Sequence, residues 1–371
     1  ATAAGAGEDA LMLSGGIDSR LVAGVLARLG RSPEAITLGD PEDQEMRVAA
    51  TVARRLGWRH TPLPVFRRDP VGDALALRDT EHLSGGFNHC IEWEALPQLA
   101  AKPRRLHTGL VGDATMGTSH VEWARDPQTN QFTFESLFPR INRYGFSPDV
   151  LREILQPGLR EGIDIAMAAL RRAWIEGGDE GWRRSWAFDL AHRQRFHVAG
   201  MGWRLARGAW TTLPFARRRL RHALAAMPYE ELQGRSLQLA LLEEAFPDLA
   251  RLPLDRNSHD TTPLVVDSAV VRAWNRTGAR ALRRMRRRFE RTTEDRRFYY
   301  RVHAVDGPGW KEIRRTAEPF REQLHTIFHP EAVERLLPRP EERASDGDGI
   351  VDGTRVRTTI GLALWLGENL P

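Results

Sequence analysis

The chain has 371 residues, with 54 Lys and Arg against 49 Asp and Glu, a net charge of +5, and one cysteine, Cys90. This length allows a large core and two domains or lobes, and a single cysteine excludes an internal disulfide framework and a four-cysteine metal site. The sequence has neither an apolar run of ~20 residues nor a signal peptide, so we expect a cytoplasmic protein in a reducing compartment, without membrane contact.

The first informative stretch lies at residues 11–20. An apolar run, Leu11 to Leu13, ends at Ser14-Gly15-Gly16, and Ile17-Asp18-Ser19 opens a segment with apolar residues at helical spacing. These apolar residues are Leu21, Val22, Val25, Leu26 and Leu29. The pattern predicts a strand, a tight turn and a helix. An α/β enzyme rarely starts so close to such a turn, so we expect the sequence to be a piece of a longer chain.

This turn has the chemistry of an anion site. Gly15 and Gly16 let the backbone approach a ligand closely, and the following helix N-terminus offers free N–H groups and a positive dipole end. Ser14 and Ser19 add hydroxyl donors, and Asp18 fits beside phosphates as a ligand of Mg2+. The alternative is an ordinary strand-to-helix turn in which Asp18 only complements the helix dipole.

Alternating elements follow along the chain. Residues 34–40 read as a strand that ends near Leu38 and Gly39, 46–56 as a helix, and 60–65 as a strand. A helix at 91–101 and a strand at 105–108 come next. Strands that alternate with helices predict an α/β fold with a parallel sheet and helices on both faces. Ligands then bind beyond the carboxyl ends of the strands.

A second glycine-rich loop, residues 109–117, follows the strand at 105–108. It begins at Gly109 and carries Asp113, which can complete a carboxylate pair with Asp18 for Mg2+. The alternative is a flexible surface loop with a solvated Asp113.

The pattern changes to long helical stretches from about residue 147. We therefore predict an α/β core over 1–145 and a largely helical lobe over 146–371, which packs on the core and forms the substrate side. An arginine-rich run at 279–291 has Leu282, Met285 and Phe289 at helical spacing. This favours an amphipathic helix with a solvated face over nucleic-acid binding.

The motifs together resemble the synthetase domain of the asparagine synthetase B family, an N-type ATP pyrophosphatase family that includes β-lactam synthetases and lasso-peptide cyclases. The Ser14-Gly15-Gly16-x-Asp18-Ser19 loop, the strand from Ala35 to Gly39 and the loop from Thr108 to Gly117 match in order. More loosely, Trp210 to Phe215 and Leu252 to Arg256 are similar to the family's later motifs.

The resemblance implies an adenine nucleotide α-hydrolase-like fold and an ATP-dependent, AMP-forming carbon–nitrogen ligase. Adenine is expected against the backbone of Leu13, Leu38 and Gly109, with Gly39 beside it. The phosphates are expected on the loop formed by Ser14, Gly15, Gly16, Asp18 and Ser19. Asp18 and Asp113 would hold Mg2+. A substrate carboxylate would attack the α-phosphate, and an amine would then displace AMP.

The chain departs from the family at several positions. Leu110 stands where Glu or Tyr is common, and Ala114 where an acid is common. The run from Asn257 to His259 stands in place of the usual lysine. Either Arg256 or another arginine then stabilises charge in the second half-reaction, or that step differs.

No glutaminase domain is expected, so the amine would be ammonia, a substrate amino group or ammonia from a separate glutaminase or carrier partner. The expected substrates are a small-molecule or peptide carboxylate and this amine. Two alternatives stay open: a tRNA-modifying ATP pyrophosphatase, in view of the basic charge, and a non-catalytic nucleotide-binding homologue.

Overall fold

The computed structural model describes residues 9–41, 43–63, 69–81, 91–101, 105–255, 261–266, 305–344 and 350–370. They form two compact units, each built from segments far apart in the sequence. Unit 1 takes the described parts of 1–65, 95–119 and 201–301, and unit 2 those of 66–94, 120–200 and 302–371. The predicted division at residue 145 stays a prediction. Arg256 and the predicted helix at 279–291 lie outside the described residues.

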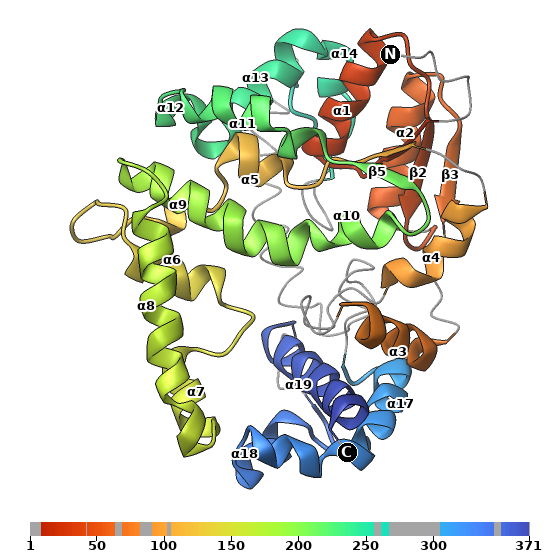
Figure 1. The fold of residues 1–371 in the computed structure, drawn as a ribbon. Coiled ribbons are helices and arrows are strands. Elements are labelled where there is room, and N and C mark those ends of the chain that lie inside the picture. The colour runs from red at the N-terminus through yellow and green to blue at the C-terminus, as the bar shows by residue number, and fades with distance from the viewer. Residues whose placement is uncertain are drawn as a thin grey trace, which may run out of the picture. The chain divides into compact units, whose positions relative to one another are not determined.

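Unit 1 contains a five-stranded parallel sheet with the strand order β3-β2-β1-β4-β5 (Figure 1). The strands are β1 (Asp9–Met12), β2 (Glu34–Leu38), β3 (His60–Leu63), β4 (Arg105–His107) and β5 (Trp210–Thr212). Leu11 lies at the centre, in register with Ala35 on β2 and with His107 on β4. The middle residues of the central strands are apolar and buried, as expected for a parallel sheet covered by helices; they are Ala10, Leu11, Ala35, Ile36 and Leu106. The predicted α/β fold is confirmed.

Helices surround this sheet in unit 1. They are α1 (Ile17–Arg28), α2 (Gln44–Arg55), α4 (Ile91–Ala100), α5 (Gly112–Gly117), α10 (Gly200–Leu205), α11 (Arg218–Ala225), α12 (Tyr229–Leu232), α13 (Ser236–Ala245) and α14 (Pro247–Ala250). Helix α2, at the predicted place, buries one apolar face that consists of Met46, Val48, Ala49, Val52 and Ala53. Short 3-10 turns at Pro214–Ala216 and Gln233–Arg235 connect the later helices.

The fifth strand comes from a part of the chain where the sequence predicts mainly helices. Strand β5 pairs in parallel with β4, with Trp210 opposite Arg105 and Thr212 opposite His107. The hydroxyl of Thr212 also lies 2.9 Å from Nδ1 of His107. The strand lies among stretches with a helical pattern, which is why the sequence does not reveal it.

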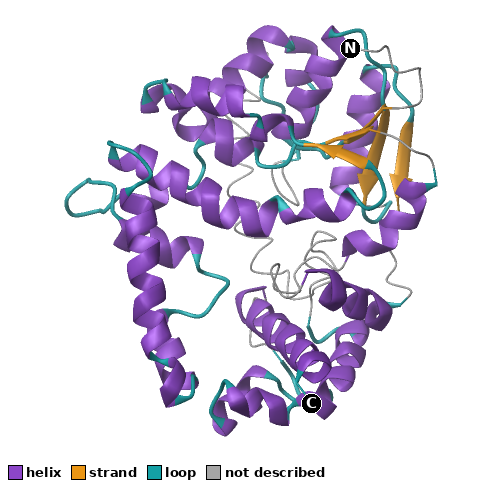
Figure 2. Ribbon diagram, in the orientation of Figure 1, coloured by secondary structure: helices purple, strands orange, loops and turns teal. Residues whose placement is uncertain are grey.

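Unit 2 is helical within the described residues, as Figure 2 shows. Its helices are α3 (Pro70–Glu81), α6 (Phe134–Ile141), α7 (Pro148–Ile154), α8 (Glu161–Ile175), α9 (Gly181–Asp189), α17 (Pro308–Ala317), α18 (Pro330–Leu336) and α19 (Ile350–Asn369). A π-helix covers Leu190–Val198, and 3-10 turns cover Val121–Ala124, Pro157–Leu159, Glu318–Phe320 and Glu322–Thr326. One core centres on Trp310, Ile313 and Ile360, and a smaller one on Phe134, Trp174 and Phe188.

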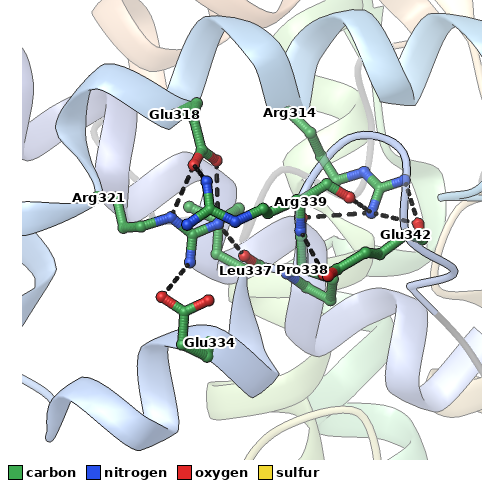
Figure 3. A network of polar contacts seen from close by, with 8 residues as sticks. All are labelled: Arg314, Glu318, Arg321, Glu334, Leu337, Pro338, Arg339 and Glu342. Atoms are coloured by element: carbon green, nitrogen blue, oxygen red, sulfur yellow. Dashed lines mark hydrogen bonds and ion pairs between the residues drawn. The ribbon is translucent and has the colours of Figure 1, made fainter.

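A buried arginine fixes the chain after α18. Arg314, fully buried on α17, donates hydrogen bonds to the carbonyls of Pro338, Arg339 and Glu342 (Figure 3). It also donates to the carbonyl of Pro340. Figure 3 also shows Arg321 held by both carboxylate oxygens of Glu318, each at 2.9 Å. A charged donor that satisfies several carbonyls can fix a segment that has no regular secondary structure.

No helix in the described part of the chain is long and apolar enough to cross a membrane.

Candidate functional site

The predicted anion loop lies at the carboxyl end of β1, the central strand. Its two serines close it: the hydroxyls of Ser14 and Ser19 lie 2.9 Å apart, and Ser19 also accepts from the amide of Ser14 at 3.1 Å. The amide of Gly16 donates to the Ser14 hydroxyl at 3.2 Å. Gly16 is the N-cap of α1, and no side chain of the described residues caps this helix. The uncapped N-terminus therefore leaves N–H groups for an anion.

The second glycine loop faces the first, as the sequence predicts. A Cβ atom on Gly109 would lie 2.5 Å from the amide nitrogen of Ser19, so only glycine fits against this turn of α1. A Cβ atom on Gly112 would lie 2.8 Å from the carboxylate of Asp18. Between them, Val111 has φ +59°, a left-handed conformation that is rare for a β-branched residue. Such strain persists only where the surrounding structure enforces it.

Part of this predicted loop is helical. Residues Gly112–Gly117 form α5, and Asp113 lies in its first turn. The carbonyl of Asp113 accepts from both the amide and the hydroxyl of Ser119, at 3.3 and 3.0 Å. These bonds fix the backbone that carries the carboxylate.

Asp18 is the electrostatic centre of the site. The pKa of its carboxyl is raised from 3.8 to about 6, chiefly by burial and in part by the nearby charge of Asp113, against the opposing charge of Arg235 and the hydrogen bonds from Gln238 and Arg235. Both of these residues donate to Oδ1 of Asp18, Gln238 from Nε2 at 2.7 Å and Arg235 through an ion pair. Two carboxylates close enough to repel form a site with affinity for a cation.

The strand-end residues expected around adenine lie at the same edge of the sheet. The amide of Leu13 donates to the carbonyl of Ile36 at 2.8 Å, and the carbonyl of Leu13 accepts from the hydroxyl of Thr37 at 2.7 Å. Gly39 follows Leu38 at the end of β2 and has φ +135°, in the left-handed region that favours glycine. The structure thus brings Leu13, Leu38, Gly39 and Gly109 to strand ends, and their contact with adenine stays a prediction.

The segment that precedes Arg256 lies directly against the anion loop. The amide of Asp255 donates to the carbonyl of Gly15 at 2.9 Å, and its carboxylate accepts from Gln44 at 2.9 Å. A Cβ atom on Gly15 would lie only 2.6 Å from that of Asp255. The role of Arg256, which lies outside the described residues, stays a prediction.

Arg20 attaches this segment to the loop. Its fully buried guanidinium donates to the carbonyls of Leu249 and Leu252, at 2.8 and 3.1 Å, to that of Pro253, and to that of Gly15 at 3.3 Å. Sequence reasoning missed Arg20 and also Arg235 and Gln238. Arg235 lies 217 positions from Asp18, and only Lys102 and Lys311 among the 54 basic residues are not arginine, so arginine carries little positional signal here.

Among the described residues, no group of three or more His, Cys, Asp or Glu side chains is placed to hold a metal ion. Magnesium differs from most metals in this respect, because proteins usually hold it through one or two carboxylates and the phosphates of a substrate. Asp18 and Asp113 match that smaller donor set.

The fold and its loops define an α/β protein with a glycine-rich candidate phosphate site at the carboxyl edge of a parallel sheet. A family model described as asparagine synthase matches residues 7–366, nearly the whole chain. The chain therefore belongs to the asparagine synthase family, whose members are in general ATP-dependent ligases that form amides. None of the curated proteins compared with the chain matches it.

Proposed function

We propose that the chain activates a carboxylate as an acyl-adenylate, with release of pyrophosphate, and transfers the acyl group to an amine, with release of AMP. One observation carries this proposal: the loop from Ser14 to Ser19, the backbone of Gly109 and the carboxylates of Asp18 and Asp113 converge at one edge of the sheet. Family membership supplies the reaction class.

The residues of the loop act by position and charge. The N–H groups at the start of α1 and the hydroxyls of Ser14 and Ser19 bind the β- and γ-phosphates, which become the leaving pyrophosphate. Gly109 leaves room because a side chain there would meet Ser19. Preorganised donors of this kind stabilise developing charge without reorganising during the reaction.

Asp18 and Asp113 would hold Mg2+, whose donor preferences they fit. A bound cation neutralises charge on a departing pyrophosphate. The position of Asp18 is fixed by Gln238, whose side chain is fully buried, and that of Asp113 by the bonds of its backbone to Ser119.

The proposed reaction consists of two displacements. A carboxylate oxygen forms a bond to the α-phosphorus while the bond to the β-phosphate oxygen breaks and its electrons leave on pyrophosphate. The amine nitrogen then bonds to the acyl carbon, the carbon–oxygen bond to AMP breaks, and the nitrogen releases a proton. An arginine, Arg256 by our proposal, stabilises charge in this step as an anion clamp.

The test is to incubate the chain with ATP, Mg2+ and a panel of carboxylates and amines, and to separate the nucleotide products. We expect AMP and pyrophosphate in equal amounts; ADP and phosphate would overturn the proposal. Asp113→Asn removes one proposed Mg2+ ligand and should abolish most turnover. Asp126→Asn changes a half-buried aspartate in unit 2, serves as the matched control and should keep turnover.

A further inference from the structure

Two side chains from one short segment meet the carboxylate of Asp18. Arg235 and Gln238 both donate to the same oxygen, Oδ1, and Nε of Arg235 also donates to Oε1 of Gln238 at 2.7 Å. The three side chains therefore form a closed cluster. Gln238 is fully buried, whereas the side chains of Arg235 and Asp18 are 27% and 24% exposed. The guanidinium can reach a ligand as well as the carboxylate.

The backbone is shaped to place Arg235 there. Gly234 and Arg235 are both left-handed, with φ +63° and +69°, immediately before α13. This conformation is unfavourable for a residue with a side chain, so surrounding contacts enforce it. At Gly117, the end of α5, a Cβ atom would lie 2.6 Å from Cγ of Arg235 and 2.9 Å from Oε1 of Gln238. Because Gly117 has no side chain, the side chain of Arg235 has room to extend to Asp18.

The charge of Arg235 has opposite effects on two ligands of this site. A bare divalent cation on Asp18 would lie close to the guanidinium and would be repelled by it. A cation that arrives with a triphosphate brings several negative charges, which attract the same guanidinium and offer it oxygens for bidentate hydrogen bonds.

We propose that Arg235, positioned by Gln238, makes this site selective for the complex of a divalent cation with ATP over the bare cation. Without nucleotide, the guanidinium of Arg235 is paired with the carboxylate of Asp18. When the complex binds, the guanidinium turns from Asp18 to the phosphates and the carboxylate takes the cation. This assignment rests on the proposed function, because it needs ATP in the loop, and it adds to it a residue that sets which form of the ligand binds.

The experiment compares two titrations of the wild-type chain and of Arg235→Gln: Mn2+ without nucleotide, followed by electron paramagnetic resonance, and Mg2+–ATP, followed by calorimetry. We expect Arg235→Gln to bind bare Mn2+ at least about tenfold more tightly and Mg2+–ATP at least about tenfold more weakly, since one strong charge interaction changes binding on this scale. Arg235→Lys keeps the charge but loses the paired N–H donors of the guanidinium, so its affinities should lie between those of the wild type and Arg235→Gln.

The controls separate this effect from damage to the fold. Arg55→Gln removes an arginine paired with Asp248 at 2.6 Å, elsewhere in unit 1, and should leave both affinities unchanged. Adding Asp18→Asn to Arg235→Gln should abolish the gained Mn2+ binding. Affinities that stay the same in Arg235→Gln, or that both fall, would overturn the proposal, as would tight binding of bare Mn2+ by the wild type.

The two proposals fail in different ways. If the wild type binds Mg2+–ATP but no carboxylate ever leads to AMP, the proposed reaction is wrong and the two titrations still decide the role of Arg235. If AMP forms and the titrations of Arg235→Gln match the wild type, only the role of Arg235 is wrong. A wild type that does not bind Mg2+–ATP at all would overturn both.

Discussion

Asp18→Asn is expected to stabilise the fold while it abolishes turnover. Asparagine has nearly the shape of aspartate, and its Oδ1 can still accept from Arg235 and Gln238. What it removes is a charge that burial disfavours, as shown by a pKa raised from 3.8 to about 6. That pKa already includes the attraction of Arg235, so it reports the net balance.

The sign and size follow from proton linkage. The folded chain keeps the proton of Asp18 to a higher pH than the unfolded chain, so stability falls as pH rises from 3.8 to about 6. The loss is absent below the unfolded pKa and complete above the folded one. At about 1.4 kcal/mol per pH unit, the stability advantage of Asp18→Asn should be about 1.5 kcal/mol at pH 5 and about 3 kcal/mol at pH 8.

The assay is denaturant unfolding of both proteins between pH 5 and pH 8. The matched control is Asp126→Asn, because hydrogen bonds from the amides of Thr129 and Gln128 lower the pKa of Asp126. Its charge is favourable in the fold, so this variant should be less stable than the wild type at neutral pH. An Asp18→Asn variant that is no more stable than the wild type at pH 8, or whose advantage shrinks as pH rises, would refute the reasoning.

Two further substitutions test the supports of the loop. Arg20→Met leaves buried carbonyls without their donor and should destabilise the chain by about 3–5 kcal/mol in denaturant unfolding. Arg28 lies on the same helix, and Arg28→Met removes one exposed hydrogen bond to the carbonyl of Ala245 and the stacking of the guanidinium on Phe246, so it should cost under about 1 kcal/mol. Equal losses in the two variants would show that Arg20 is no more important than an exposed arginine. Gly109→Ala should displace Ser19 and weaken ATP binding in calorimetry. The control Gly162→Ala, which has open space around it, should leave ATP binding unchanged. Unchanged affinity in Gly109→Ala would show that the turn accommodates a side chain there.

Local patterns were enough to predict the first four strands of the sheet. Their apolar runs and the helical spacing after Ser19 and Glu45 are features of short sequence windows, and parallel connections follow from their alternation. Helix α3 and strand β5 were not predicted. Helix α5 was expected as a loop, because its two glycines are typical of turns and its packing against α13 comes from far along the chain.

The site divides in the same way. The residues from Ser14 to Ser19, Gly109 and Asp113 were recognised because each follows a strand at a known spacing. Arg20 and Arg235 were not, because Leu249 and Asp18, partners that reveal their roles, lie more than 200 positions away and arginine is frequent throughout. Only the folded chain shows that Arg235 forms an ion pair with the carboxylate of Asp18.

The proposed reaction requires a carboxylate oxygen to attack the α-phosphorus of ATP. It is tested most directly with a carboxylate that supports pyrophosphate release, labelled with 18O in both oxygens, by mass spectrometry of the AMP formed. We expect one 18O atom in each AMP and one in the amide product. AMP without 18O would contradict it, because the acyl group would then never have been bonded to the nucleotide through its own oxygen.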